Sequence, residues 1–90
     1  MNSPEFITDA DLARIDLLVH CATRGPWKSY VEGRDHEAGS DFIKTPIGDI
    51  ELSGATVADQ DFIASARQDV PALVAEVKRL RRLLGAGKKV

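Results

Sequence analysis

The clearest pattern in this chain is the spacing of apolar residues in its last third, residues 59–84. Two helical stripes of apolar residues are separated there by Pro71. The members of the second stripe are spaced 3, 4, 3 and 4 residues apart, as in a heptad: Val70, Leu73, Val77, Leu80 and Leu84. A helix face this apolar needs cover, either from the rest of the domain or from a second copy of the chain.

An amphipathic helix is predicted near the N-terminus. Thr8 is a suitable N-cap residue, and Asp11 three residues later approximates a capping box. Apolar residues then recur on one helical face: Leu12, Ile15, Leu18, Val19 and Ala22. We expect this helix to end near Thr23, because the Arg-Gly-Pro sequence at residues 24–26 breaks it.

The pattern between residues 27 and 54 changes to alternation with a period of two, which predicts strands. The first runs from Trp27 to Glu32 and the second from Asp41 to Thr45. A third begins at Ile50, after a turn over residues 46–49. Three short strands in succession indicate an antiparallel meander, which is the least sheet that is stable with a helix packed on it.

The last third predicts two further helices. Thr56 is the N-cap of the first, again with an aspartate, Asp59, three residues later. Pro71 has no N–H to donate and forbids a straight continuation, so we expect a bend near Asp69. A third helix then runs to Leu84 and ends at a glycine.

These elements predict an α+β fold in the order α-β-β-β-α-α, a three-stranded antiparallel meander packed with three helices. Residues 8–85 form the single domain, residues 1–7 are expected to be disordered or vector-derived, and residues 86–90 form a disordered basic tail. The expected core contains these residues: Ile15, Leu18, Phe42, Ile50, Leu52, Phe62, Ile63, Leu73 and Val77.

Composition narrows the class of protein. Ninety residues make one domain at most, and its stability is marginal unless something adds to its core. The only cysteine, Cys21, cannot form an internal disulfide, and its place on an apolar helix predicts a buried residue. No stretch reaches the roughly 20 apolar residues of a membrane span, and the polar start is no signal peptide. We therefore expect a cytoplasmic protein with no membrane contact.

The charge is distributed unevenly. Residues 1–66 hold five basic and twelve acidic side chains, whereas residues 67–90 hold seven basic and two acidic ones. A basic end is one mark of a nucleic-acid partner. Here, however, the cations lie in the last turns of a helix, where they suit the negative end of its dipole and flank the heptad face. The sequence therefore does not favour nucleic acid.

The densest polar group could carry chemistry: Glu32, Arg34, Asp35, His36, Glu37 and Asp41. His36 could act as a base oriented by Asp35 or Glu37, or the group could hold a hard cation or zinc. Neighbouring residues of a strand, however, point to opposite faces. A zinc site would also need His20 and Cys21, which lie on the apolar helix. The sequence predicts no metal, no cofactor and no catalytic residue here, and a solvated loop is the main interpretation.

A small-ligand site remains as an alternative interpretation of the polar residues. Two guanidinium groups and the flat face of an aromatic ring could line a groove for a nucleotide-like anion. Its candidate residues are Trp27, Arg34, Asp35, His36 and Arg67. The alternative for Arg67 is structural, because it could clamp the bend by pairing with Asp69 or with carbonyls at the end of the second helix.

Three blocks of the chain resemble a known group of proteins. Thr23–Trp27 (TRGPW) is similar to a T-P-G-P-W box, with Arg24 in place of the first proline. Residues 32–43 and 49–71, which contain an F-I-A-x-A-R element, are similar to further blocks in the same order. This combination resembles the Ead/Ea22-like group of small proteins from bacteria and their phages. The resemblance implies the setting of a phage or mobile element and no chemistry.

These observations leave three hypotheses for the function. The first is a non-enzymatic accessory or interaction protein, a homodimer through the heptad helix, although that helix could instead serve the internal core. The second is a sequestering protein that binds a nucleotide-like anion near Arg34, His36 and Arg67. The third, a small hydrolase that uses His36, has the least support, so no enzyme is predicted.

Overall fold

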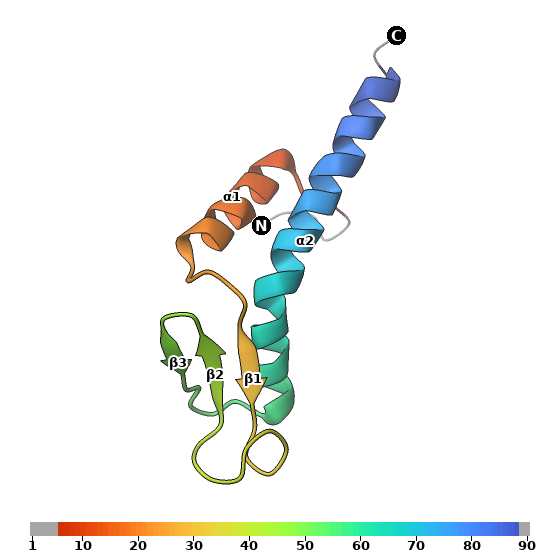
Figure 1. Cartoon of the computed structure of the whole chain (residues 1–90). Coiled ribbons are helices and arrows are strands. Elements are labelled where there is room, and N and C mark those ends of the chain that lie inside the picture. The colour runs from red at the N-terminus through yellow and green to blue at the C-terminus, as the bar shows by residue number, and fades with distance from the viewer. Residues whose placement is uncertain (1–5, 89–90) are drawn as a thin grey trace.

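The computed structural model describes residues 6–88. The elements follow in the order α1 (Asp9–Cys21), β1 (Lys28–Tyr30), β2 (Phe42–Thr45), β3 (Gly48–Ile50) and α2 (Val57–Lys88) (Figure 1). The α+β class and the three-stranded antiparallel sheet are confirmed. The described residues hold two helices, however, and not the three that the sequence predicts.

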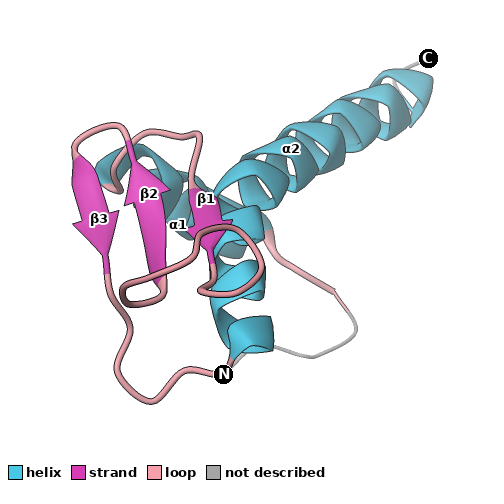
Figure 2. Ribbon diagram, turned by 60° about the horizontal axis from the view of Figure 1, so that its bottom comes forward, coloured by secondary structure: helices cyan, strands magenta, loops and turns pink. Residues whose placement is uncertain are grey.

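Pro71 lies inside a single helix of 32 residues, so the predicted break near Asp69 and the separate third helix are wrong. Figures 1 and 2 show that α2 changes direction near its middle. An internal proline costs about 3 kcal/mol through a lost hydrogen bond and a steric clash. The sheet packs on α2 before Pro71, and α1 contacts α2 both before Pro71, through Arg67, and after it, through Lys78; this packing supports the continuous helix.

Each helix begins at the local capping signal that the sequence predicts. Thr8 and Asp11 form the predicted capping box of α1, with backbone-to-side-chain distances of 3.0 and 3.1 Å. Thr56 and Asp59 form the same reciprocal pair at the start of α2. The far end of α2 differs from the prediction, because the helix passes Leu84 and continues to Lys88. The expected disorder of residues 1–5 and 89–90 lies outside the described residues.

The sheet has the order β1-β2-β3, and Ser29 and Ile50 lie opposite Ile43 on either side. β3 begins at Gly48, two residues earlier than predicted, because only residues 46–47 form the turn. The face that carries Ile43 is buried and packs on α2, as the views in Figures 1 and 2 indicate. The opposite face carries the ring of Phe42, which stacks on Tyr30 at a centroid distance of 5.2 Å.

The core differs from the predicted one. Its buried members are Leu12, Val31, Ile43, Ala64 and Val74, together with the polar residues Thr45 and Gln60. None of the nine predicted core residues is among them, and Leu18, Phe62 and Leu73 are exposed. Cys21 is exposed as well, so its predicted burial is also wrong. The reason is that the sheet and α1 pack on different parts of α2, so each covers only a short length of it.

The resulting shape is elongated, with extents of 61 × 26 × 22 Å and a radius of gyration of 17.1 Å. A compact chain of this length has a radius of gyration of about 12 Å. The sheet lies beside the N-terminal part of α2, α1 lies beside its middle, and the C-terminal end projects beyond both (Figure 1). Much of the surface of α2 is therefore left uncovered.

Candidate functional site

Arg67 ties α2 to the end of α1. Its Nη1 donates hydrogen bonds to the backbone carbonyls of Val19 at 3.0 Å and Thr23 at 3.1 Å. The last carbonyls of a helix have no partner within it, so this guanidinium caps α1. The predicted pairing of Arg67 with Asp69 or with the end of the second helix is therefore wrong, and the Asp69 carboxylate accepts from Ser65 instead.

Trp27 is fixed against α2 by its backbone. Its N–H donates to Oε1 of Gln68 at 2.8 Å, and its carbonyl accepts from Nε2 of the same side chain at 3.4 Å. The indole N–H donates to the carbonyl of Arg24 at 3.2 Å. The ring is thereby positioned where β1 meets the two helices.

An apolar groove lies between α1 and the middle of α2, with a volume of about 250 Å³. Its lining includes Leu18, Val19, Trp27, Ala66, Arg67, Val70 and Pro71. We call this feature the inter-helix groove. Leu18 at its edge is 59% exposed, so the groove is an open apolar surface and not a sealed cavity.

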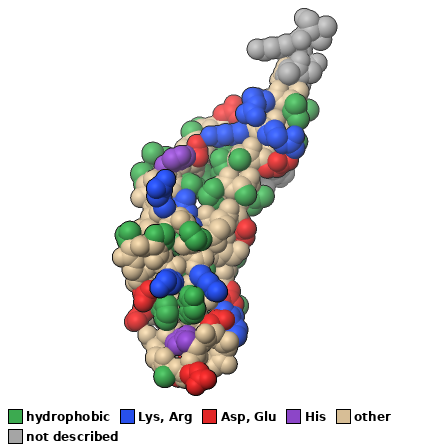
Figure 3. Space-filling model, viewed as in Figure 1, with side chains coloured by type: hydrophobic (Ala, Val, Ile, Leu, Met, Phe, Trp, Pro, Cys, Tyr) green, Lys and Arg blue, Asp and Glu red, His purple; other side chains and the backbone are tan. Residues whose placement is uncertain are grey.

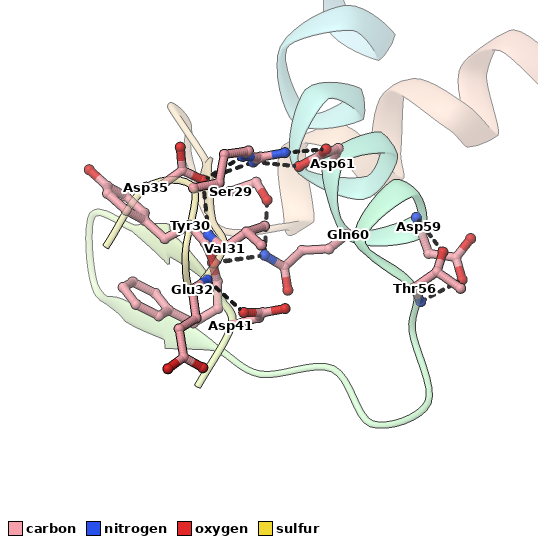
Figure 4. A network of polar contacts seen from close by, with 12 residues as sticks. Ser29, Tyr30, Val31, Glu32, Asp35, Asp41, Thr56, Asp59, Gln60 and Asp61 are labelled. Atoms are coloured by element: carbon pink, nitrogen blue, oxygen red, sulfur yellow. Dashed lines mark hydrogen bonds and ion pairs between the residues drawn. The ribbon is translucent and has the colours of Figure 1, made fainter. Parts of the chain in front are cut away.

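Arg34 belongs to a different part of the molecule. Its guanidinium donates to both carboxylate oxygens of Asp61 at 2.9 and 3.0 Å, and its Nε donates to Asp35 at 2.9 Å (Figure 4). The Asp35 carboxylate also accepts the backbone N–H of Val31 at 2.9 Å. Arg34 therefore pins the loop after β1 to α2, and two carboxylates already occupy its donors.

His36 lies in the same loop as Arg34. Its Nδ1 is 2.9 Å from the carbonyl oxygen of Ala38, and its ring centroid is 5.5 Å from that of Phe42. Its Nε2 is buried and has no hydrogen-bond partner. The carboxylate of Asp35, the predicted orienting group, is instead bonded to Arg34 and to the backbone N–H of Val31.

The five predicted ligand-binding residues do not converge on one site. Trp27 and Arg67 line the inter-helix groove, whereas Arg34, Asp35 and His36 line a separate depression of about 270 Å³ in the loop of residues 33–37. Within residues 6–88, no group of three His, Cys, Asp or Glu side chains is placed to hold a metal ion.

The pairing of Arg34 with Asp61 makes a prediction about pH. The hydrogen bond from Arg34, followed by one from Ser29, lowers the pKa of the Asp61 carboxyl to about 2. An unfolded aspartate has a pKa of about 3.9, so this group stabilises the fold above that pH and loses its contribution as pH falls towards 2. Urea unfolding of the native chain and of Asp61→Asn should show a constant difference above about pH 4 that shrinks at lower pH. A difference independent of pH would contradict the pairing.

The basic end of α2 is largely neutralised by the chain itself. Three of its cations form ion pairs: Lys78 with Asp16 at 2.6 Å, Arg79 with Glu76 at 2.5 Å, and Arg81 with Asp9 at 2.5 Å. Figure 3 shows basic side chains gathered over this part of α2 with acidic ones among them. The pairs to Asp9 and Asp16 join α2 to α1, so these cations hold the two helices together.

The heptad of the sequence is divided between the inside and the outside of the molecule. Val70 lines the inter-helix groove, and Val77 is half-buried. Leu73, Leu80 and Leu84 are 63%, 46% and 66% exposed. They continue the helical face of Phe62, which is 74% exposed. We call Phe62, Leu73, Leu80 and Leu84 the exposed stripe.

The apolar width of the heptad helix in the sequence already indicates such a division. Val74 and Leu83 broaden the apolar face beyond the heptad positions, which favours two packing partners rather than one. In the structure Val74 is buried, while Leu83 is 57% exposed. Sequence reasoning missed Phe62 as a surface residue, because its spacing from Ile63 and Ala66 is equally typical of a core helix.

Comparison with family models, with curated proteins and with solved structures finds no match to this chain. Within the described part, neither helix combines the length and the apolarity needed to cross a membrane.

Proposed function

We propose that this protein is a small non-enzymatic interaction protein that forms a homodimer through the exposed stripe of α2. The observation that carries this proposal is the exposure of four large apolar side chains on one face of a helix. From Phe62 to Leu84 this face extends over about 33 Å. Monomeric proteins rarely leave an apolar surface of this kind in contact with water, and such surfaces mark interaction sites.

The overall shape supports a second copy as the occupant of this surface. A radius of gyration of 17.1 Å, against about 12 Å for a compact chain of this length, leaves the chain with little core of its own. Oligomerisation is a common way for a short chain to bury further apolar area. A symmetric pair needs only one self-complementary patch, and the members of the exposed stripe share one face of α2.

The biological setting follows from the resemblance alone. The blocks at residues 23–27, 32–43 and 49–71 support an accessory protein of a phage or mobile element. A second function, sequestration of a nucleotide-like anion, has less support, because the guanidinium of Arg34 is already bound by Asp61 and Asp35.

Light scattering over a concentration series tests the proposed function. We expect the native chain to have the mass of two chains. We expect the double variant Phe62→Glu/Leu73→Glu to have the mass of one, because association would then bury unpaired charges. Leu17→Glu is the matched control, since Leu17 is 62% exposed on α1, outside the exposed stripe. A native mass of one chain at high concentration, or a double variant that remains dimeric, would contradict the proposal.

A further inference from the structure

Phe62 and the inter-helix groove are two apolar features that the chain leaves uncovered. Phe62 is 74% exposed, and it borders a second groove, of about 450 Å³, that is also lined by Leu52, Ala55 and Ile63. The inter-helix groove begins on α2 at Ile63, the residue after Phe62, and continues past Ala66 and Val70. A large exposed side chain and an apolar groove therefore lie next to each other on the same helix.

Ala66 lines the inter-helix groove one helical turn after Phe62, and its side chain is small. It follows Phe62 by four residues and precedes Leu73 by seven, so all three share one helical face. A small residue at a crossing point allows two helices to approach closely, because interaxial distance depends on the side chains at the contact. This position is therefore suited to a symmetric crossing of two copies.

We propose that two copies pair their α2 helices antiparallel, with Ala66 against Ala66, and that each Phe62 enters the partner's inter-helix groove. The proposal rests on the proposed function, because it specifies how that dimer is built. In this register the residue four before Ala66 lies opposite the residue four after it, so Phe62 meets Val70 of the partner subunit. Leu73 likewise meets Asp59 of the partner subunit, which lines the second groove.

One symmetry operation thus covers Phe62, Leu73 and both grooves, whereas Leu80 and Leu84 lie beyond the start of the partner's α2. Phe62 fills the inter-helix groove and covers the exposed edge of Leu18, while Leu73 covers the second groove. A parallel pair in register would instead bring Asp69 and Glu76 beside their own copies, because both lie next to the exposed stripe. Like charges placed together oppose association, which favours the antiparallel arrangement.

Interchain disulfide formation tests the register. In a Cys21→Ser background, Ala66→Cys should give a covalent dimer under mild oxidation, because the two copies of this residue meet at the symmetry axis. Leu84→Cys should give none, since its two copies lie 36 helical residues apart, about 54 Å. A disulfide requires Cα atoms within about 7 Å. Phe62→Cys/Val70→Cys in the same background should also form a covalent dimer, because these positions are about 12 Å apart within one chain.

The outcomes separate the register from the dimer itself. Covalent dimers at residue 66 and at the 62/70 pair, with none at residue 84, would support the antiparallel register. Efficient crosslinking of Leu84→Cys would overturn it in favour of a parallel pair. A two-chain mass by light scattering without crosslinking at residue 66 or the 62/70 pair would also overturn it, while leaving the proposed function in place. A one-chain mass of the Cys21→Ser chain would overturn both.

Discussion

Replacing Ile43 by alanine should lower the free energy of unfolding by about 2–5 kcal/mol. Ile43 is the one large side chain that is fully buried among the described residues, with 0% exposure. It lies on the central strand, between Ser29 and Ile50 of the neighbouring strands, on the face that packs on α2. The change removes apolar contacts and leaves a cavity that short strands cannot easily close. For a chain of 90 residues, the loss is a large part of a total of about 5–13 kcal/mol.

Ile47→Ala is the matched control for this substitution. Ile47 lies in the turn after β2 and is 82% exposed, so the same loss of atoms should change stability by no more than about 0.5 kcal/mol. Urea unfolding at one fixed protein concentration measures both variants, since self-association would make stability depend on concentration. Equal effects of the two substitutions would contradict the assignment of the buried sheet face.

Local signals in the sequence predicted the elements of this fold well. The capping boxes at Thr8 and Thr56 were correct, because a side chain and a backbone group three residues away decide a helix start by themselves. The antiparallel meander was also correct in its order and in the approximate bounds of β1 and β2, whereas β3 ends at Ile50, where the prediction began it. Turn residues and the alternation of apolar and polar residues are local features, so strands can be predicted from them without knowledge of the tertiary structure.

Local signals did not predict which face of the sheet is buried. Alternation over residues 41–45 places Phe42 and Lys44 on one face and Ile43 and Thr45 on the other. The prediction placed the face that carries the aromatic ring in the core, and this was the wrong face. Lys44 beside Phe42 was the available warning, because a lysine rarely accompanies a core residue on the same buried face. The rings of Phe42 and Tyr30 instead stack on each other on the outer face.

The helices show the same limit of local reasoning. Pro71 is a strong local signal for a break, yet α2 is continuous, with contacts to the sheet and to α1 along its length, and only changes direction near its middle. The role of Arg67 was also inaccessible, because its acceptors on Val19 and Thr23 lie more than 40 residues away in sequence. The heptad correctly marked an apolar helix face, but only the position of α1 decides which of its members are left exposed.

Replacing Gln60 by glutamate should destabilise the fold by about 3–5 kcal/mol at neutral pH. Gln60 is 4% exposed, although it sits among polar groups. Its Nε2 donates to the hydroxyl of Ser29 at 2.9 Å and to the carbonyls of Tyr30 at 3.1 Å and Phe42 at 3.2 Å (Figure 4). The side chain therefore joins α2 to two strands at once. A carboxylate of the same shape has no donor for those carbonyls and brings a buried negative charge beside them.

The pH dependence of Gln60→Glu distinguishes this cause from a simple loss of packing. Burial raises the pKa of the introduced carboxyl above the unfolded value of about 4.3, because it penalises the charged form. The added instability should therefore be greatest above the folded pKa and should fade as pH falls to about 4, where the carboxyl is protonated in both states. Urea unfolding of the native and variant chains between pH 4 and 8 measures this change.

Gln68→Glu provides the control on the same helix. Gln68 is exposed, and its Oε1 accepts the backbone N–H of Trp27, a contact that a carboxylate retains. The change loses only the donation from Nε2 to Ala64 and Trp27, so we expect a loss below about 1.5 kcal/mol with little dependence on pH. If Gln60→Glu proved as mild as Gln68→Glu at neutral pH, the amide of Gln60 would not be the buried link between α2 and the sheet.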